Sequence, residues 1–429
     1  MNVLVTGATG LIGSAVCARL AADGHKVIGT SRGPQAVAGG AVARWIRVDF
    51  AEATGPAEWL PHLHGVDAVV NCVGVLQDNP RENTSAAHAL GASALFQACV
   101  EAGARRVVHF SAIGVDRHQA SAFSATKLQG DEALTALPLD WVILRPSVVL
   151  GRPVFGASAL FRGLAALPIM PQMSDTGPLQ VVALEDVVDT VAFFIEPDAP
   201  ARVALELAGP ERLSMSDVVA QHRAWLGWKP ARRLQLPRWA AAALYRLGDF
   251  IGGLGWRPPM RSTARREIVH GAVGDPTQWS KITGIKPKSL AATLAMRPVT
   301  VQERWFAKLY FLKPVIFVIL VTFWLATGII SLTTGFPSGV ELMVKARTGI
   351  LAAPGVVAGA VADILVGLAI AWRPTAWYGL WSAIGLSCFY IVAGTLLLPE
   401  LWNEPLGPLL KIWPILATHF VALAILDER

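Results

Sequence analysis

The first part of the chain alternates short runs of β-branched residues with longer stretches rich in alanine. Short runs of Val and Ile predict buried strands, and the alanine-rich stretches predict helices. The predicted strands cover residues 27–29, 45–48, 68–71, 107–110, 142–144 and 203–207, and the predicted helices include 11–22, 86–102, 122–137 and 184–195. This alternation predicts an α/β fold with a doubly wound parallel sheet, whose ligands bind at the carboxyl ends of the strands.

After Arg145-Pro146 the pattern loosens into segments rich in Gly and Pro. We therefore expect one domain over residues 1–300, with a small substrate-side part mainly at 151–180 and 209–300. Within that part, residues 238–256 combine Trp239 and other large apolar side chains with Arg238 and Arg246. This run is interpreted as a helix of the substrate-side part, with a helix in a membrane surface as the alternative.

From Pro314 onward the pattern changes to four long apolar stretches, at residues 314–334, 350–372, 376–398 and 406–426. Each is near the ~20 residues that a helix needs to cross a bilayer. The sequence predicts an all-α bundle of four transmembrane helices over 314–429, preceded by a basic juxtamembrane linker at 301–313.

Charge around these stretches predicts their orientation. Arg304, Lys308 and Lys313 precede the first one, and Arg373 lies between the second and third. Lys345, between the first and second, favours the opposite orientation. Because basic loops stay inside, we expect the inner membrane of a bacterium, with the first domain and the C-terminus in the cytoplasm. No signal peptide is apparent before the first strand.

The net charge of +6 arises before Pro314, because five basic and six acidic residues follow that position. A basic first part suits an anionic lipid surface, and the chain has no motif for nucleic acid. The four cysteines have no spacing typical of a metal site, so no metal is expected.

A glycine motif follows the first predicted strand, in the order Thr6-Gly7-Ala8-Thr9-Gly10-Leu11-Ile12-Gly13. Gly7 permits a tight turn, Gly10 lets a pyrophosphate approach the backbone, and Gly13 lets the next helix pack closely. The sequence predicts a dinucleotide site here, with an ordinary glycine-rich turn as the alternative. The predicted cofactor contacts are Gly7, Thr9, Gly10, Leu11, Ile12 and Gly13.

The second strand ends with Ser31 and Arg32 rather than with an acidic residue. An arginine suits the 2'-phosphate of NADP(H), so NADP(H) is preferred, and NAD(H) stays open because Arg32 also fits a solvated loop.

These residues resemble the short-chain dehydrogenase/reductase superfamily, especially its atypical and extended branches, including NmrA-like proteins and the accessory dinucleotide-binding subunit of respiratory complex I. Further matches follow the later strands. The resemblance implies that Asp49 contacts adenine, that Ser111 polarises a substrate carbonyl and that Lys127 binds the nicotinamide ribose. Asn71-Cys72-Val73-Gly74 matches the family pattern after the fourth strand, which makes Cys72, Val73 and Gly74 cofactor contacts.

One position departs from the family pattern. Phe123 occupies the place of the tyrosine four residues before Lys127, and phenylalanine cannot transfer a proton. General acid catalysis contributes a factor of ~10² to 10⁴, so carbonyl reduction needs another donor. His118 and Ser121 lie nearby, although polar residues before a helix commonly cap it. The sequence leaves open whether the protein is an enzyme.

The last part resembles DoxX-like membrane domains, a family that includes subunits associated with quinone-linked oxidation. Asp363 and His419 interrupt its apolar stretches. A charged group at mid-membrane costs about 2.5 to 3.5 kcal/mol, so both should face the bundle interior. They serve either helix packing or a proton or ligand role.

Three functions follow from these features. The first is a membrane-anchored, NAD(P)-binding oxidoreductase acting on an apolar substrate such as a quinone or lipid. The second is a non-catalytic NADP(H)-binding redox sensor, or an assembly component with a partner protein in the membrane, which Phe123 favours. A transporter formed by the apolar helices has less support.

Overall fold

The computed structural model describes residues 1–33, 40–78, 83–119, 121–405 and 407–427. It forms two compact units, and each is described by itself. The first contains Met1–Asp249 and Pro258–Ala307, and the second contains Phe250–Arg257 and Lys308–Arg429.

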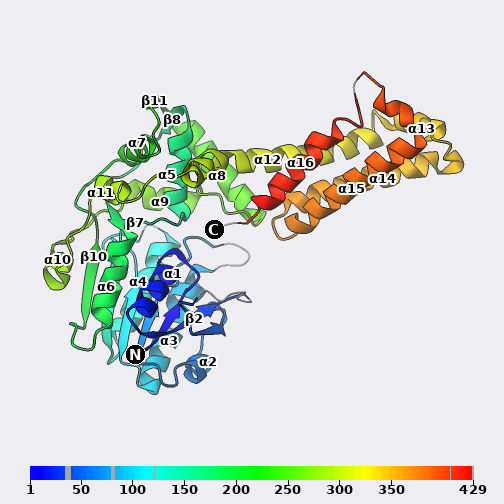
Figure 1. Cartoon of the computed structure of the whole chain (residues 1–429). Coiled ribbons are helices and arrows are strands. Elements are labelled where there is room, and N and C mark those ends of the chain that lie inside the picture. The colour runs from blue at the N-terminus through cyan, green and yellow to red at the C-terminus, as the bar shows by residue number, and fades with distance from the viewer. Residues whose placement is uncertain (34–39, 79–82, 120, 406, 428–429) are drawn as a thin grey trace. The chain divides into compact units, whose positions relative to one another are not determined.

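A seven-stranded parallel sheet forms the centre of the first unit (Figure 1). Its strand order is β10-β6-β5-β4-β1-β2-β3, which confirms the predicted doubly wound sheet. The strands are β1 (Asn2–Thr6), β2 (Lys26–Ser31), β3 (Arg44–Arg47), β4 (Ala68–Asn71), β5 (Arg106–Phe110), β6 (Asp140–Pro146) and β10 (Val203–Leu207). The chain turns from one half of the sheet to the other between β1 and β4, where this fold binds its ligands.

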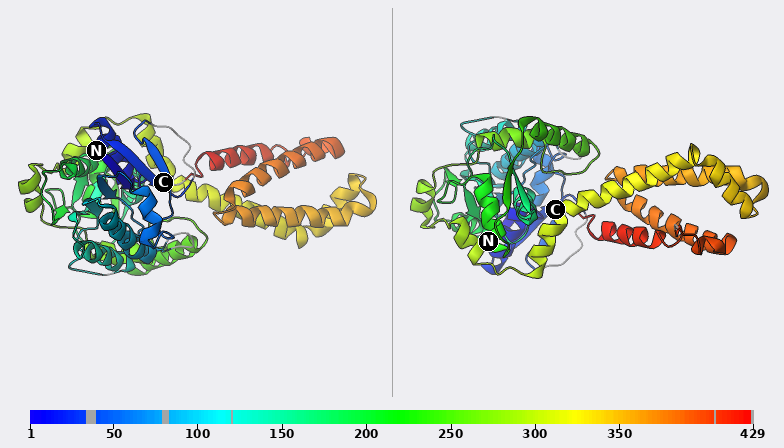
Figure 2. Two further views of the ribbon diagram at one scale, coloured as in Figure 1. Left: turned by 90° about the horizontal axis from the view of Figure 1, so that it is seen from below. Right: turned by 90° about the horizontal axis from the view of Figure 1, so that it is seen from above.

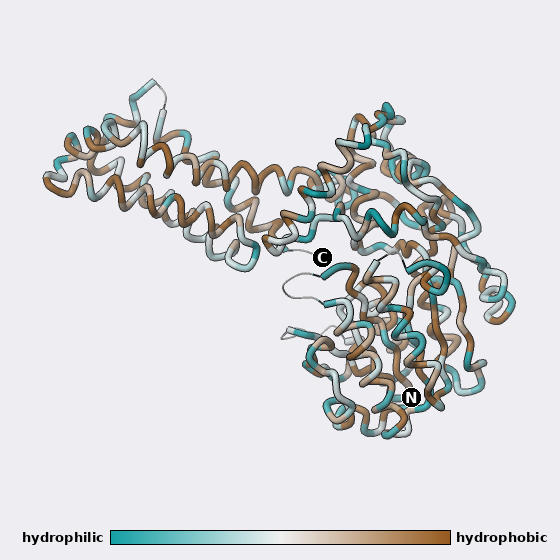
Figure 3. Tube along the Cα trace, turned by 180° about the vertical axis from the view of Figure 1, so that it is seen from behind, coloured by the Kyte–Doolittle hydropathy of each residue, from teal (hydrophilic) through white to brown (hydrophobic). Residues whose placement is uncertain are grey.

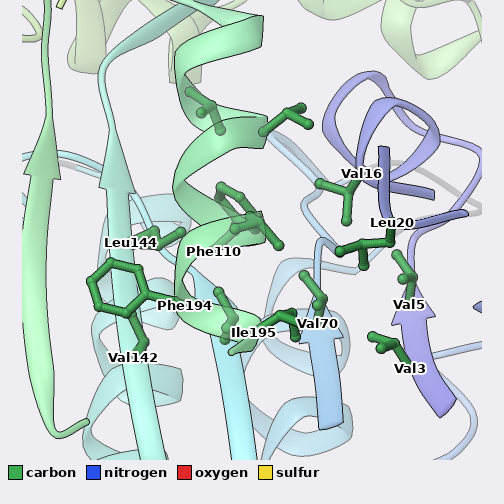
Figure 4. Packing of buried hydrophobic residues seen from close by; sticks show 14 of the residues in the cluster. Val3, Val5, Val16, Leu20, Val70, Phe110, Val142, Leu144, Phe194 and Ile195 are labelled. Carbon is green, nitrogen blue, oxygen red and sulfur yellow. The ribbon is translucent and has the colours of Figure 1, made fainter. Parts of the chain in front are cut away.

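Helices cover both faces of the sheet, because alternate strand residues point to opposite sides. Val3 and Val5 pack with α1 (Leu11–Ala22) and α6 (Leu184–Ile195), in the cluster drawn in Figure 4. Leu4 belongs to the opposite cluster. That cluster includes residues of α2 (Pro56–Trp59), α3 (Gly91–Ala102) and α4 (Ala122–Thr135). A π-helical turn at Ala86–Leu90 precedes α3, within the helix predicted at 86–102.

The part of the first unit that was predicted to lie on the substrate side has short elements and a separate core. β7 (Val148–Leu150) pairs with β9 (Val181–Ala183), and β8 (Ile169–Gln172) pairs with β11 (Arg232–Gln235). Phe161, Met170, Val218 and Leu290 lie in their shared core. The helices are α5 (Gly156–Ala166), α7 (Met215–Trp225), α8 (Arg238–Gly253, which ends in the second unit), α9 (Ser262–His270), α10 (Thr277–Thr283) and α11 (Leu290–Ala295).

The second unit is helical, and apolar residues dominate its length (Figures 2 and 3). Its helices are α12 (Val301–Leu332, which begins in the first unit), α13 (Phe336–Lys345), α14 (Ala352–Ala371), α15 (Ala376–Leu397) and α16 (Ile412–Ala424). Phe317, Val366, Leu380 and Ala422 share one core cluster and come from four different helices. Among the described residues, three helices are long and apolar enough to cross a membrane, namely those within 301–332, 349–371 and 376–397.

The bundle differs from the prediction at one of its four spans. Among the described residues of the stretch predicted at 406–426, a helix forms only over the 13 residues of α16. At about 1.5 Å per residue, that helix is shorter than the ~30 Å hydrocarbon core. It starts late because Gly407, with φ +54°, and Pro408 form a turn before it. In addition, residues 301–313, expected as a linker, lie within α12.

Candidate active site

The glycine motif forms the turn between β1 and α1. Gly7 has φ +65°, and a Cβ on it would lie 2.9 Å from the carbonyl carbon and oxygen of Cys72. A Cβ on Gly13 would strike the carbonyl oxygen of Gly7. Gly10 precedes the first turn of α1, where no side chain caps the helix and no acidic residue is present. The first amides of α1, including those of Leu11 and Ile12, therefore fit a pyrophosphate.

Asn71 joins the two central strands beside this turn. Its Oδ1 accepts hydrogen bonds from the Thr6 hydroxyl at 2.8 Å and from the Val73 amide at 3.2 Å. Its Nδ2 donates to Nδ1 of His109 at 3.1 Å. The side chain thus fixes the loop that carries Cys72, Val73 and Gly74 next to the glycine turn.

Lys127 is buried where β4 and β5 end. Its Nζ donates to the carbonyl oxygens of Val73 at 2.9 Å and of Phe110 at 2.8 Å. Burial lowers the pKa of Lys127 to about 8, although Asp131 and Cys72 oppose this shift. An ammonium group has three hydrogens, so one stays available after the two carbonyls, and Gly74 adds no side chain next to it. The arrangement suits a lysine that binds a ribose hydroxyl.

Ser111, predicted to polarise a substrate carbonyl, forms a hydrogen bond within the protein. Its hydroxyl donates to Oδ2 of Asp131 at 2.9 Å, and Arg145 binds the same oxygen at 3.0 Å. Burial raises the pKa of Asp131, against the lowering effect of Ser111 and Arg145. Because a serine has one proton to donate, Ser111 cannot give it to Asp131 and to a substrate carbonyl at the same time.

His88 is a neutral, buried support for α4. Its Nε2 accepts the Val75 amide hydrogen at 2.9 Å, and its Nδ1 lies 3.0 Å from the Thr126 hydroxyl. Since Nε2 accepts, the proton must be on Nδ1. Burial, and then the positive charge of Lys127, lower the pKa of His88 to about 2. The ring of Phe123 packs edge-on against it at 5.6 Å.

The start of α4, on either side of Phe123, contacts a carboxylate. Ser121 donates to Oε1 of Glu267 at 2.5 Å, and Ser124 donates to the same oxygen at 3.0 Å. Ser121 also caps α4, as its alternative interpretation predicts. His118 stacks on His270 with ring centres 5.1 Å apart. Glu267 on α9 therefore places an ionisable group beside the position that lacks the tyrosine.

The remaining predicted cofactor residues lie at the rim, after β2 and β3. Ser31 donates to the carbonyl oxygen of Gly33 at 2.8 Å, and Arg32 follows it. Asp49 accepts the Ala51 amide hydrogen at 3.0 Å through Oδ1, so this carboxylate also stabilises a turn.

In the second unit, each predicted polar residue has an aromatic partner. Tyr390 donates to Oδ1 of Asp363 at 2.9 Å, and Trp324 donates to Nε2 of His419 at 2.9 Å. Asp363 and His419 are both buried within this unit. The two contacts join different helices, which fits a packing role.

Sequence reasoning did not identify Glu267, Asp131 or His88 as parts of the site. Glu267 lies 143 residues after Ser124, and no local pattern connects them. The spacing of Ser121 and Ser124 does signal a capping box, which is the local feature that Glu267 contacts.

Two family models match separate parts of the chain. Residues 3–166 match the NAD dependent epimerase/dehydratase family, and residues 321–420 match the DoxX-like family. The chain thus carries a Rossmann domain of the epimerase and short-chain dehydrogenase/reductase type, followed by a DoxX-like domain.

Curated relatives share the first part. An uncharacterized protein of Mycobacterium tuberculosis is 28% identical over 186 residues, which cover 43% of this chain and 19% of that protein. The chain therefore spans about a fifth of the length of these mycobacterial relatives. Ceramide reductase of Caulobacter vibrioides is 24% identical over 284 residues, covering 65% of this chain and 85% of the enzyme. The 40 kDa subunit of mitochondrial NADH-ubiquinone oxidoreductase from Neurospora crassa is 24% identical over 296 residues, covering 67% and 76%.

Solved structures share the fold of the same part. MoeE5 in complex with UDP-glucuronic acid and NAD has a TM-score of 0.53 and 21% sequence identity, covering 69% of this chain and 97% of that one. The UDP-N-acetylglucosamine 4-epimerase of Bacillus cereus has a TM-score of 0.52 and 14% identity, covering 69% and 97%.

Proposed function

Because the chain joins a Rossmann domain of the epimerase/dehydratase type to a DoxX-like domain, we propose that it is a membrane-anchored NAD(P)-dependent oxidoreductase that reduces the carbonyl of an apolar substrate. The proposal rests on one observation. The carboxylate of Glu267 accepts hydrogen bonds from Ser121 and Ser124, which lie on either side of Phe123 in the sequence.

The glycine turn and Lys127 would hold the nucleotide. The first turn of α1 offers amides to the pyrophosphate, and Lys127 offers its remaining hydrogen to the ribose. A reduced nicotinamide, when bound, supplies the hydride that, together with one proton, converts a ketone to an alcohol or a quinone to a hydroquinone. Several similar structures contain NAD, and the matched family is NAD dependent, which supports this class of cofactor. We propose NADP(H) as the preferred form, because Arg32 can pair with a 2'-phosphate and β2 ends without a carboxylate.

The carbonyl oxygen also needs one proton when its carbon receives the hydride. We assign that proton to the carboxyl group of Glu267, transferred directly to the carbonyl oxygen. Glu267 is half-buried, so it can recover a proton from water. Ser111 and Asp131 then have a positioning role, because their hydrogen bonds fix α4 against β5 and β6.

The relative in Caulobacter vibrioides, named ceramide reductase, favours a lipid substrate, and a quinone is the other apolar candidate. A hollow of about 470 Å³ is lined by Arg265, Arg266 and His270 on α9. Glu267 lies on the same helix. A basic hollow suits a substrate with an apolar body and a polar or anionic head.

The second unit would keep the enzyme at its substrate. Three long apolar helices and the DoxX-like match indicate membrane association. We propose the inner membrane of a bacterium, with the nucleotide domain and the C-terminus in the cytoplasm, on the basis of Arg304, Lys308, Lys313 and Arg373.

The test uses the full chain in detergent micelles, with NADPH or NADH and either a keto-ceramide or a short-chain ubiquinone. Loss of nicotinamide absorbance measures turnover. We expect Glu267→Gln to lower turnover at least ~100-fold while the nucleotide dissociation constant stays unchanged. Glu132→Gln, on the exposed side of α4, is the matched control. Equal turnover in Glu267→Gln and the wild type would contradict the assigned proton donor.

A second function, a non-catalytic nucleotide-binding component of a membrane assembly, is favoured by Phe123 and by the direction of the Ser111 hydroxyl. The relative that is a subunit of NADH-ubiquinone oxidoreductase supports it, and it implies a partner protein in the membrane. Tight retention of the nucleotide with no turnover on either substrate would select this function over the enzyme.

A further inference from the structure

Helix α8 has two unlike faces. Ala241, Tyr245 and Gly248, three or four residues apart, form its buried face. Tyr245 contacts the sulfur of Met173 at 3.4 Å, and the guanidinium of Arg265 lies over its ring. A Cβ on Gly248 would strike the Met260 carbonyl oxygen. This face is therefore packed against the substrate-side part of the first unit.

The opposite face is apolar and exposed. Trp239 is 76% exposed, Leu247 53% and Phe250 67%, and they share one side of the helix at intervals of eight and three residues. Burying such large side chains is favourable, at about 25 cal/mol per Å² of apolar surface removed from water. A contiguous exposed face of this kind marks an interaction site rather than ordinary surface.

Exposed arginines lie on α8 and on the strand before it. Arg238 and Arg246 lie on α8 itself, and the strand before it, β11, presents Arg232 and Arg233 to solvent. The combination of large apolar side chains with arginine on one helix is typical of helices that lie in the surface of an anionic membrane.

The last turn of α8 and the residues directly after it pack at one end of the bundle. Residues Phe250–Arg257 belong to the second unit. There, Trp256 donates to the carbonyl oxygen of Ala371 at 2.8 Å, and its ring lies 4.7 Å from that of Phe317. The Arg373 amide donates to the Leu254 carbonyl oxygen at 3.0 Å. Ala371 ends α14 and Ala376 begins α15, so the segment lies where two apolar helices reach their boundary with water.

We propose that α8 is an interfacial membrane helix, with Trp239, Leu247 and Phe250 in the outer acyl region of an anionic bilayer and Arg238 and Arg246 at the lipid phosphates. A bilayer is the occupant because α8 leads, without a break in the chain, into the segment at the end of the apolar bundle. The arginines match anionic headgroups. The inference rests on the membrane association of the second unit and is independent of the proposed catalysis.

The experiment places an environment-sensitive fluorophore on single cysteines in the full chain, with the exposed Cys388 replaced by serine. The chain is reconstituted in vesicles of phosphatidylcholine with 0% or 30% phosphatidylglycerol as chosen test compositions, an anionic range in which surface binding responds to charge. Lipids that carry a shallow spin label serve as quenchers. The labelled positions are Leu247→Cys on the exposed face, Gln97→Cys on α3 as the solvent control, and Leu365→Cys on α14 as the membrane control.

We expect strong quenching at position 247, none at 97, and more quenching at 247 in the anionic vesicles. The added variant Arg238→Gln with Arg246→Gln should remove that dependence on anionic lipid. No quenching at 247 beside strong quenching at 365 would overturn the proposal and would indicate a protein partner for this face. No quenching at 365 would instead contradict the membrane association itself. Equal quenching at 247 in both lipids would overturn the role of the arginines.

Discussion

The two units bury polar groups in different ways. In the first unit, Lys127 donates to two main-chain carbonyls and His88 bridges a main-chain amide and a hydroxyl. In the second, Asp363 and His419 each have one described side-chain partner, Tyr390 and Trp324. The first network involves the backbone of the sheet edge that we propose as the nucleotide site, whereas each contact of the second joins two helices.

This difference indicates which buried polar side chains hold the backbone of the candidate site in place. A buried polar group that satisfies main-chain atoms is costly to remove, because its partners stay buried and unpaired. Removing a single side-chain hydrogen bond between apolar helices should destabilise the protein less. The measured interaction free energies of such hydrogen bonds in membrane proteins average about 0.6 kcal/mol. Substitutions should therefore have large, pH-dependent effects in the first unit and small effects in the second.

The largest effect is expected for Lys127→Met. Two buried carbonyls would lose their donor, at about 1 to 3 kcal/mol each, and the nucleotide would lose its ribose contact. We expect the amides of β4 and β5 to exchange with deuterium faster by a factor that corresponds to a loss of about 2 to 6 kcal/mol. Lys281→Met, at an exposed site of α10, is the control, with a change within about 0.5 kcal/mol. Equal effects of the two variants would remove the distinction between the units.

The second-largest effect is a loss of folding stability at acidic pH. Burial lowers the pKa of His88 from its ordinary value of 6.5 to about 2 in the folded protein, so protons bind the unfolded state more strongly as the pH falls below 6.5. The wild type should therefore lose about 2 kcal/mol of stability through this group between pH 6.5 and pH 5.

The variant His88→Leu should be less stable at pH 7 but should lose less stability on acidification than the wild type. Hydrogen exchange of β4 and α4 at both pH values measures the difference. His109, whose pKa burial also lowers well below 6.5, keeps its own contribution in both proteins. An unchanged acid response would show that His88 is not held neutral.

A third test applies to the rim of the nucleotide site, where groups are solvated. Arg32→Asp should lower the preference for NADPH over NADH at least ~10-fold, because one charge-assisted contact is lost and a repulsive charge is added. Titration calorimetry with both nucleotides measures it. Arg44→Asp, at the amino end of β3, is the matched control. Retention of the wild-type preference in Arg32→Asp would assign Arg32 to the solvated loop.

The smallest effect is expected for Tyr390→Phe, which removes the hydrogen bond to Asp363. The midpoint of thermal unfolding in detergent should shift by an amount that corresponds to about 1 kcal/mol or less. Tyr378→Phe, on the exposed surface of α15, is the control. A loss as large as that of Lys127→Met would indicate a role for Asp363 beyond helix packing.

The hydrophobic pattern predicted the sheet well, because its strands are short, buried and separated by alanine-rich helices. It also predicted the turn at Gly7, since positive φ and close packing there require glycine. The hydrophobic pattern did not predict features that depend on contacts between residues far apart in the sequence. Glu267 reaches Ser121 and Ser124 from a distant helix, and hydropathy alone could not reveal the turn at Gly407 that shortens α16. The role of Ser111 depends on the direction of one hydroxyl, which no local pattern encodes.

Residues Phe250–Arg257 have a consequence for how the protein is made. The chain enters the second unit with this segment, returns to the first for Pro258–Ala307, and re-enters with Lys308. During synthesis, the hydrogen bond from the Trp256 indole to the carbonyl oxygen of Ala371 therefore cannot form until more than a hundred further residues have been added. No single cut in the chain separates the two units, so an exchange of the second unit between related proteins must include the eight residues Phe250–Arg257 together with the helices.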